Sequence, residues 1–315
     1  MRRSKPKQDN PKAMLKKAKK AVKKGDIDEA KLFFEFCIRN YLDTGFTFKA
    51  IAAAKLAKSI LMNHPRVIAM LIRLYSSAGL DAQAQEEYRI SALRLQKNRC
   101  GLLKNLNRNE FVDILDIIDI LDVKKGASIL NQGQAGEEIY VSLSGRLEVT
   151  RDSKRVSVMK PGDIFGELGF FHHSRRSAAV KAIDHCTIMQ IPAPELRGLC
   201  EKHPGIVHAL EKIYTQRILK KASEDIFHDP LFDLKQDEIT SFHFTRGQTI
   251  PIDLNMDLAI VKHGVVEINY NKDGLNHKEF YGPGSTFRKK PGIARANTAV
   301  DILRARIDLL GLRNN

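Results

Sequence analysis

The sequence contains no tryptophan, and only four of its 315 residues are cysteines. Cys37, Cys100, Cys186 and Cys200 are scattered, form no CxxC pair and have no histidine at the spacing of a metal site. This pattern is typical of reduced thiols in a cytoplasmic protein, and it favours neither a disulfide framework nor a bound metal.

Long apolar runs are also missing. No stretch of 18 or more uncharged apolar residues occurs, and the start of the chain, MRRSKPKQDNPKAMLKKAKK, lacks the apolar core of a signal peptide. We therefore expect no membrane span and a cytoplasmic location. The length and an apolar content of 43% are sufficient for two or three domains with cores of their own.

Acidic residues are scarce at the N-terminus. Residues 1–24 contain eleven Lys or Arg and one acid, Asp9, in a chain whose net charge is +15. A basic flexible tail over 1–11 can contact nucleic acid, anionic lipid or an acidic protein face, or it is a frayed tail that leads into a well-solvated helix. The tail has no aromatic residue, so it offers no candidate for base stacking.

Residues 12–98 predict successive helices, with Gly and Pro only at the joints. Three pairs of like residues are 34 positions apart: Tyr41 and Tyr75, Gly45 and Gly79, and Ala50 and Ala84. This period and residue order resemble the tetratricopeptide repeat. The resemblance implies paired helices with a peptide-binding face for a protein partner; the alternative is a plain helical cap on the next domain.

Short strands replace the helical pattern from about Phe111. The segments ASILNQG, EEIYVSLSG, RLEVTR, RVSVMKPG and AAVKAIDHCTIMQIP alternate apolar and polar residues between turn residues. A short helix, a proline break and a long helix follow, and after Asp229-Pro230 the strand pattern returns in the same order. The expected fold is multidomain α + β: helical repeats, then two β-roll (jelly-roll-like) domains over 105–228 and 230–315, the first with a long C-terminal helix.

The stretch FGELGFFHHSRRSAAV combines one acid, a glycine turn and two arginines. Gly166 opens a short helix whose free N–H groups favour an anion. Arg176 can give two parallel hydrogen bonds to a phosphate, and Ser177 and Ala178 are small enough to let the backbone approach it. Glu167 would repel a simple phosphate, so its presence indicates an anion that also carries a hydroxyl group.

Together with KKGASILNQGQAGEEIYVSLSGRLEV and MKPGDIF, this stretch resembles the cyclic nucleotide-binding domain family. Its members include bacterial catabolite activator proteins and the regulatory subunits of cAMP-dependent protein kinase. The resemblance implies that Glu167 accepts the ribose 2′-OH. It also implies a ligand site formed by Gly166, Glu167, Leu168, Arg176, Ser177 and Ala178, with cAMP favoured over cGMP and no cofactor.

The sequence departs from the family on the long helix, where Lys221, Ala222 and Ser223 are the candidate base contacts. cGMP and cyclic dinucleotides therefore stay open as ligands. A further alternative is that Glu167 and Arg176 pair with each other in a degenerate pocket.

The second β region lacks the motif, because Phe287 is followed by Arg288, Lys289 and Lys290. Arg295-Ala296-Asn297 resembles the arginine step. This region is predicted to be a structural half without the same ligand, or a basic cleft for another anion.

Catalysis is not expected, because no nucleophile with its base, metal cluster or Walker-type loop occurs. Strands follow the long helix where catabolite activator relatives carry a helix-turn-helix, so sequence-specific DNA binding is not expected either. The sequence favours a signalling adaptor in which ligand moves the 204–226 helix and changes a partner-binding face. The alternative is a constitutive scaffold with degenerate pockets.

Overall fold

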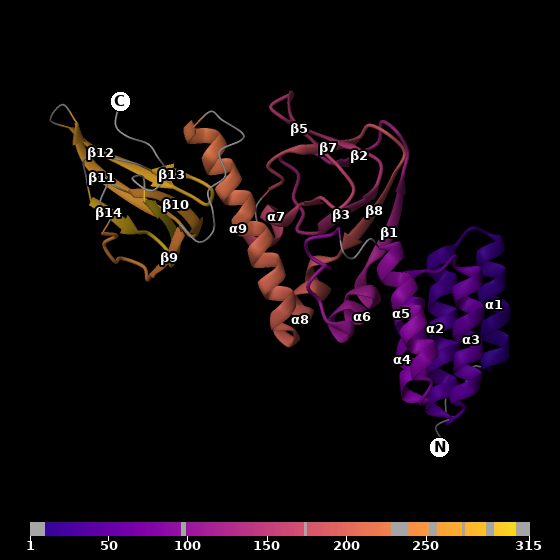
Figure 1. Ribbon diagram of the computed structural model, residues 1–315. Helices are drawn as coiled ribbons and strands as arrows, with labels where there is room; N and C mark the ends of the chain where they lie inside the picture. The colour runs from indigo at the N-terminus through magenta and orange to yellow at the C-terminus, as the bar shows by residue number, and fades with distance from the viewer. Residues whose placement is uncertain are drawn as a thin grey trace, which may run out of the picture. The chain divides into compact units, whose positions relative to one another are not determined.

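The computed structural model describes residues 10–95, 99–172, 175–227, 239–251, 257–272, 275–287 and 293–306 (Figure 1). The chain divides into two compact units, Met1–Ala209 and Leu210–Asn315, and the boundary falls inside helix α9 (Pro204–Phe227). Across the described ranges, no helix has both the length and the apolar character that crossing a membrane requires.

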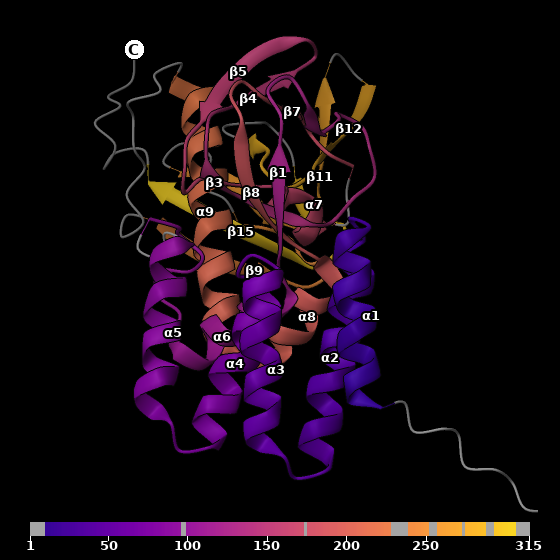
Figure 2. The same ribbon diagram turned by 90° about the vertical axis from the view of Figure 1, so that its right-hand side faces the viewer.

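The first unit begins with a helical region whose consecutive helices pack against each other (Figure 2). The helices are α1 (Pro11–Lys23), α2 (Ile27–Asp43), α3 (Thr47–Ile60), α4 (Pro65–Ser77) and α5 (Asp81–Arg94). Three of the joints share one geometry, with Gly25, Gly45 and Gly79 at φ +81°, +77° and +71°. At the last two, Phe46 N–H donates to the Tyr41 carbonyl (2.7 Å) and Leu80 N–H to the Tyr75 carbonyl (2.8 Å). These are glycine-terminated helix ends, which close each helix and reverse the chain.

The positions related by the 34-residue period occupy equivalent places. Ala50 on α3 and Ala84 on α5 are both fully buried, and Ala57 and Ser91, two turns later on the same helix faces, are buried as well. Small residues at these positions let neighbouring helices approach closely. The two hairpins α2–α3 and α4–α5 are thus structurally repeated, while the tetratricopeptide assignment stays a prediction.

Residues 108–117 differ from the sequence prediction, which placed strands from about Phe111. They form helix α6 (Arg108–Ile117). Asn107 starts it with a capping box: its side chain accepts from Glu110 N–H (3.0 Å), and Asn107 N–H donates to Glu110 Oε2 (2.9 Å). Phe111, Ile114 and Leu115 are buried at helical spacing, so the apolar run is one face of a helix.

The first β-domain consists of two four-stranded antiparallel sheets, ordered β1-β8-β3-β6 and β2-β7-β4-β5. The strands are β1 (Asp119–Val123), β2 (Ser128–Leu130), β3 (Ile139–Ser144), β4 (Leu147–Arg151), β5 (Lys154–Met159), β6 (Ile164–Phe165), β7 (Ala179–Ala182) and β8 (Cys186–Ile191). The short helix α7 (Glu167–His172) follows β6, and α8 (Ala193–Lys202) and α9 follow β8. The predicted short helix, proline break and long helix are confirmed.

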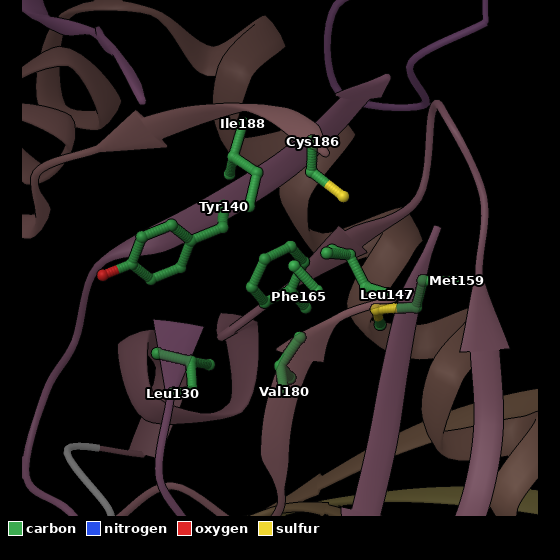
Figure 3. Close-up of a cluster of buried hydrophobic side chains, with 9 residues drawn as sticks. Leu130, Tyr140, Leu147, Met159, Phe165, Val180, Cys186 and Ile188 are labelled. Carbon is green, nitrogen blue, oxygen red and sulfur yellow. The ribbon is translucent and has the colours of Figure 1, made fainter. Parts of the chain in front are cut away.

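Side chains from both sheets form the core of this domain (Figure 3). The rings of Tyr140 and Phe165 stack at 5.2 Å between centroids, with Leu147, Val180 and Ile188 in the same cluster. Cys186 is fully buried here, and burial raises the pKa of its thiol. Burial likewise raises the pKa of Cys37 to about 11. All four cysteines are unpaired, as the sequence predicted.

The second unit repeats the strand order of the first β-domain. Its strands are β9 (Ile239–Phe244), β10 (Asp257–His263), β11 (Val266–Lys272), β12 (Leu275–Tyr281), β13 (Thr286–Phe287), β14 (Ile293–Ala296) and β15 (Val300–Arg306). One sheet has the order β9-β15-β10-β13 and the other β12-β11-β14. From Leu210 onward α9 belongs to this unit, where the Tyr214 hydroxyl donates to the Lys262 carbonyl on β10 (2.5 Å).

Matching turns identify the duplication. Gly126 N–H donates to the Ala182 carbonyl (2.8 Å) in the first β-domain, and Gly247 N–H donates to the Ala296 carbonyl (2.7 Å) in the second. Gly126 and Gly247 are structurally equivalent, because both also have φ near +85° (+84° and +86°).

Candidate functional site

The chain turns sharply between β6 and α7 at Gly166, which has a φ of +85°. A Cβ atom at this position would lie 2.6 Å from the Glu138 carbonyl oxygen on the neighbouring segment, so only glycine fits. The turn places Glu167, the first residue of α7, inside the domain, where it is 3% exposed. The predicted glycine and acid directly follow Phe165, whose ring belongs to the core in Figure 3.

Arg176 lies beside this turn and is held at both its backbone and its side chain. Its N–H donates to the Gln134 carbonyl and its carbonyl accepts from Gly133 N–H, both at 2.8 Å. Its guanidinium donates to the Gly166 carbonyl (2.9 Å) and to Glu138 Oε2 (2.8 Å). The side chain is 3% exposed, so its orientation is fixed before any ligand arrives.

Two glycines make the room that the guanidinium occupies. A Cβ on Gly136 would lie 2.9 Å from Arg176 Nη2, and one on Gly169 would lie 2.9 Å from Arg176 Nη1 and 2.5 Å from the Gly136 carbonyl oxygen. A larger residue at Gly169 would clash with backbone, and one at Gly136 would displace the Arg176 guanidinium. Sequence reasoning assigned no role to Gly136, Gly169 or Glu138, although Gly136 and Glu138 belong to the stretch NQGQAGEE that carries part of the resemblance.

Glu138 supplies the charge that balances Arg176. The Glu138 side chain is 39% exposed, whereas the Arg176 side chain is almost fully buried. A buried cation without a partner is strongly destabilising, so an acid or an anionic ligand is needed at this point. The sequence left open that Glu167 pairs with Arg176; the ion pair of Arg176 is made with Glu138 instead. Burial, and secondly the nearby Glu138 carboxylate, raise the pKa of Tyr140 on β3.

The other predicted contact residues lie around this pair. Leu168 and Ala178 are half-buried, and Ser177 is exposed at the approach to β7. The structure therefore brings together Gly166, Glu167 and Arg176, with the small residues Ser177 and Ala178 next in the chain. Lys221, Ala222 and Ser223 belong to α9, but their side chains fall outside the described residues, and the base contacts stay a prediction.

Comparison with known proteins agrees with this geometry. A family model described as "Cyclic nucleotide-binding domain" matches residues 120–203, which include every strand from β2 to β8 and helix α7. The chain contains a cyclic nucleotide-binding domain.

The similar proteins include cGMP-dependent protein kinases, of which the match covers only a part. Human cGMP-dependent protein kinase 2 is 37% identical over 89 residues, 28% of this chain and 11% of the kinase. The Caenorhabditis briggsae cGMP-dependent protein kinase egl-4 is 21% identical over 202 residues, 60% of this chain and 26% of the kinase. The match thus spans about a quarter or less of these relatives. The regulatory subunit of a cAMP-independent protein kinase A from Trypanosoma brucei is 18% identical with a TM-score of 0.35, covering 70% of this chain and 89% of that one.

An arginine outside the predicted site links α7 of the cyclic nucleotide-binding domain to α8. Arg197 Nη2 donates to the Phe170 carbonyl and to Glu137 Oε2, both at 2.8 Å, and its guanidinium lies 4.3 Å from the centre of the Phe170 ring. Arg197 therefore holds α7 and α8 together through direct contacts with Phe170. No local sequence signal pointed to this residue, because Glu137, Phe170 and Arg197 are far apart in the chain.

The joint between α8 and α9 contacts α6. His203 Nε2 lies 2.7 Å from Asp113 Oδ2, and a Cβ on Gly205 would clash with the Glu110 carboxylate. Asp113 also accepts from Arg73 on α4 (2.6 Å). The cyclic nucleotide-binding domain is thereby connected through α6 to the helical region of the same unit.

The second β-domain does not align with the site as the sequence suggested. Glu267 pairs with Arg295 in the register of β11 and β14, and Glu148 pairs with Lys181 in the register of β4 and β7. Arg295 thus corresponds to Lys181 and not to Arg176, so the predicted arginine step at Arg295 is wrong. Arg288, Lys289 and Lys290 lie outside the described residues.

Proposed function

We propose that the first β-domain binds a cyclic mononucleotide without altering it, and that the chain is a ligand-gated signalling adaptor. The observation that carries this proposal is the buried, pre-oriented Arg176 beside the buried acid Glu167. A buried arginine fork suits a phosphate, and a nearby carboxylate suits a hydroxyl group of the same ligand.

The phosphate takes the place of Glu138 on the Arg176 guanidinium. Glu138 is partly exposed, so it can turn into water when a ligand anion arrives, while Arg176 stays fixed by the Gly166 carbonyl. The buried Arg176 guanidinium therefore has an anionic partner both before and after the ligand binds. Glu167 accepts the ribose 2′-OH, which gives the site a preference for a ribonucleotide over inorganic phosphate.

Cyclic AMP is the first candidate ligand and cyclic GMP the second. The cAMP preference rests on the resemblance to catabolite activators and kinase regulatory subunits. The cGMP candidate is supported by relatives that are named cGMP-dependent protein kinases. We propose that the chain binds the nucleotide and releases it chemically unchanged, so that it is not an enzyme.

We expect one cyclic nucleotide per chain, measured by native mass spectrometry. The first β-domain has the arginine and the acid, whereas Arg288 and Lys289 follow Phe287 where the second would need glycine and glutamate. Two nucleotides per chain, with the second still bound by the Arg176→Ala variant, would contradict this assignment.

The adaptor role rests on the contacts between the helical region and the nucleotide domain. Arg73 on α4 bridges Asp113 and Asp116 of α6 (2.6 and 2.7 Å), and Asp113 touches His203 at the start of α9. Beside them a hollow of about 280 Å³ is lined by residues of α2, α4 and α6, among them the exposed Arg39. A partner bound in this hollow would contact Arg73, the same residue that pairs with Asp113 and Asp116 of α6.

Ligand should change the affinity for such a partner by about five- to a hundredfold, the usual range of coupling between two sites. Full-length protein and its Arg39→Glu variant are compared in pull-downs from the native cell, with and without cyclic nucleotide, and partners lost in the variant are titrated individually. If no partner depends on Arg39, or if saturating ligand leaves every affinity unchanged, the constitutive scaffold replaces the adaptor.

A further inference from the structure

Helix α1 contains six lysines and no acidic residue. All six side chains are exposed, and Lys12, Lys16, Lys19, Lys20 and Lys23 recur at helical spacing. At 100° per residue they occupy the face opposite Met14, Ala18 and Ala21, which are buried. These five lysines are called the lysine stripe.

The positive charge of the stripe is not balanced by any acid in the part of the chain that the structure describes. Among the residues that the structure describes, no ion pair joins any lysine of α1 to an acid; Lys17 instead lies 5.6 Å from the centre of the Phe33 ring. Like charges three or four residues apart on a helix destabilise it. An anionic surface laid along the stripe would remove this repulsion.

Two exposed phenylalanines lie near one end of the stripe. Phe46 and Phe48, at the joint between α2 and α3, are 51% and 73% exposed. Lys49 places its ammonium 3.9 Å from the centre of the Phe46 ring. Because α1 and α2 are antiparallel neighbours, the start of α1 lies beside the end of α2 and hence beside this joint (Figure 2).

A partner that binds this surface must match both the positive charge of the lysine stripe and the exposed rings of Phe46 and Phe48. The apolar face of α1 is taken up by the core it shares with Phe34 and Ala57, so α1 itself cannot insert into a membrane. A nucleic acid duplex would neutralise the stripe but leave the two phenylalanines in water. An anionic bilayer suits both, because its headgroups attract lysines and its interface accepts aromatic rings with a lysine reaching back toward water.

We propose that the lysine stripe and the Phe46–Phe48 joint form a docking surface for an anionic lipid bilayer. This goes beyond nucleotide binding, since neither Glu167 nor Arg176 takes part. The chain would lie on the membrane surface, held by charge and by two shallowly inserted rings.

Co-sedimentation with vesicles of phosphatidylcholine alone and of phosphatidylcholine mixed with phosphatidylserine tests the charge contribution. Full-length protein should bind only the anionic vesicles. The triple variant Lys16→Glu, Lys19→Glu, Lys23→Glu should lose at least about a hundredfold in affinity, since each lysine near an anionic surface contributes appreciably. The control Lys124→Glu, Lys154→Glu, Lys160→Glu makes the same charge change at exposed positions of the first β-domain. If this triple variant does not fold, the same three lysines are replaced by glutamine and vesicle binding is measured again.

The aromatic contribution is tested by Phe48→Ser, with Val156→Ser, another exposed apolar position, as control. Phe48→Ser should weaken vesicle binding about tenfold, because a large apolar side chain leaves the interface. Equal vesicle binding by the stripe variant and its control overturns the proposal. So does tighter, stripe-dependent binding to duplex DNA or RNA than to anionic vesicles.

Discussion

Replacing Arg176 by alanine should lower the affinity for cyclic nucleotide by about ten- to a hundredfold, which is the loss of a hydrogen bond to a charged group. Arg176 is the buried cation of the site, and its fork is already aligned by the Gly166 carbonyl. Arg176→Lys keeps the charge but cannot form two parallel bonds, so its affinity should lie between those of wild type and Arg176→Ala. Calorimetric titration measures all three proteins.

The neighbouring Arg175 provides the matched control. It is exposed, and its side chain donates to the Gly133 carbonyl (2.9 Å) instead of entering the buried site. Arg175→Ala removes the same charge one position away, and should leave the affinity within a small factor of wild type. An equal loss in both variants would mean that general electrostatic attraction, and not the phosphate contact of Arg176, holds the ligand.

Removing the ribose 2′-OH should weaken binding to the wild-type protein by about ten- to a hundredfold and leave Glu167→Gln almost unaffected. The reason is that the buried Glu167 carboxylate accepts a charge-assisted hydrogen bond from that hydroxyl. A double-mutant cycle of the two proteins with cAMP and 2′-deoxy-cAMP isolates the pairwise contribution.

Glu138→Gln is the control for this cycle. Glu138 is the other acid at the site, but it faces Arg176 and is displaced when the phosphate binds. This variant should still discriminate between cAMP and 2′-deoxy-cAMP. If Glu138→Gln loses the discrimination while Glu167→Gln keeps it, the roles of the two acids are reversed.

Much of the fold followed from local signals in the sequence. Glycines at positive φ, such as Gly45, Gly79, Gly126 and Gly247, end helices or turn strands, and only glycine adopts this conformation without strain. The motif around Gly166, Glu167 and Arg176 was recognisable for the same reason, since its residues lie within a short stretch of chain.

The errors arose where the deciding contact is distant or where two patterns overlap. Residues 108–117 are apolar enough to suit either a strand or a helix, and the capping box of Asn107 and Glu110 decides for a helix. Arg295 resembled the arginine step by its neighbours, but the strand register matches it to Lys181. Local similarity cannot show register, because register is set by pairing with another strand.

The partners of Arg176 could not be found from the sequence at all. Glu138 is 38 positions away, and Gly136 and Gly169 matter only because the guanidinium passes between them. Likewise Arg197 joins Glu137 and Phe170 through contacts that no local pattern encodes. Such pairs become visible only when the two sheets and α8 are assembled.

We propose above all that the first β-domain binds a cyclic mononucleotide at Arg176 and Glu167. The most direct test of this claim is calorimetric titration of full-length protein, freed of carried-over ligand, with cAMP, cGMP and cyclic dinucleotides in parallel. We expect saturable heat with a cyclic mononucleotide, cAMP ahead of cGMP, that Arg176→Ala abolishes or strongly weakens. Absence of heat and of any thermal shift with both mononucleotides at millimolar concentration would contradict the claim.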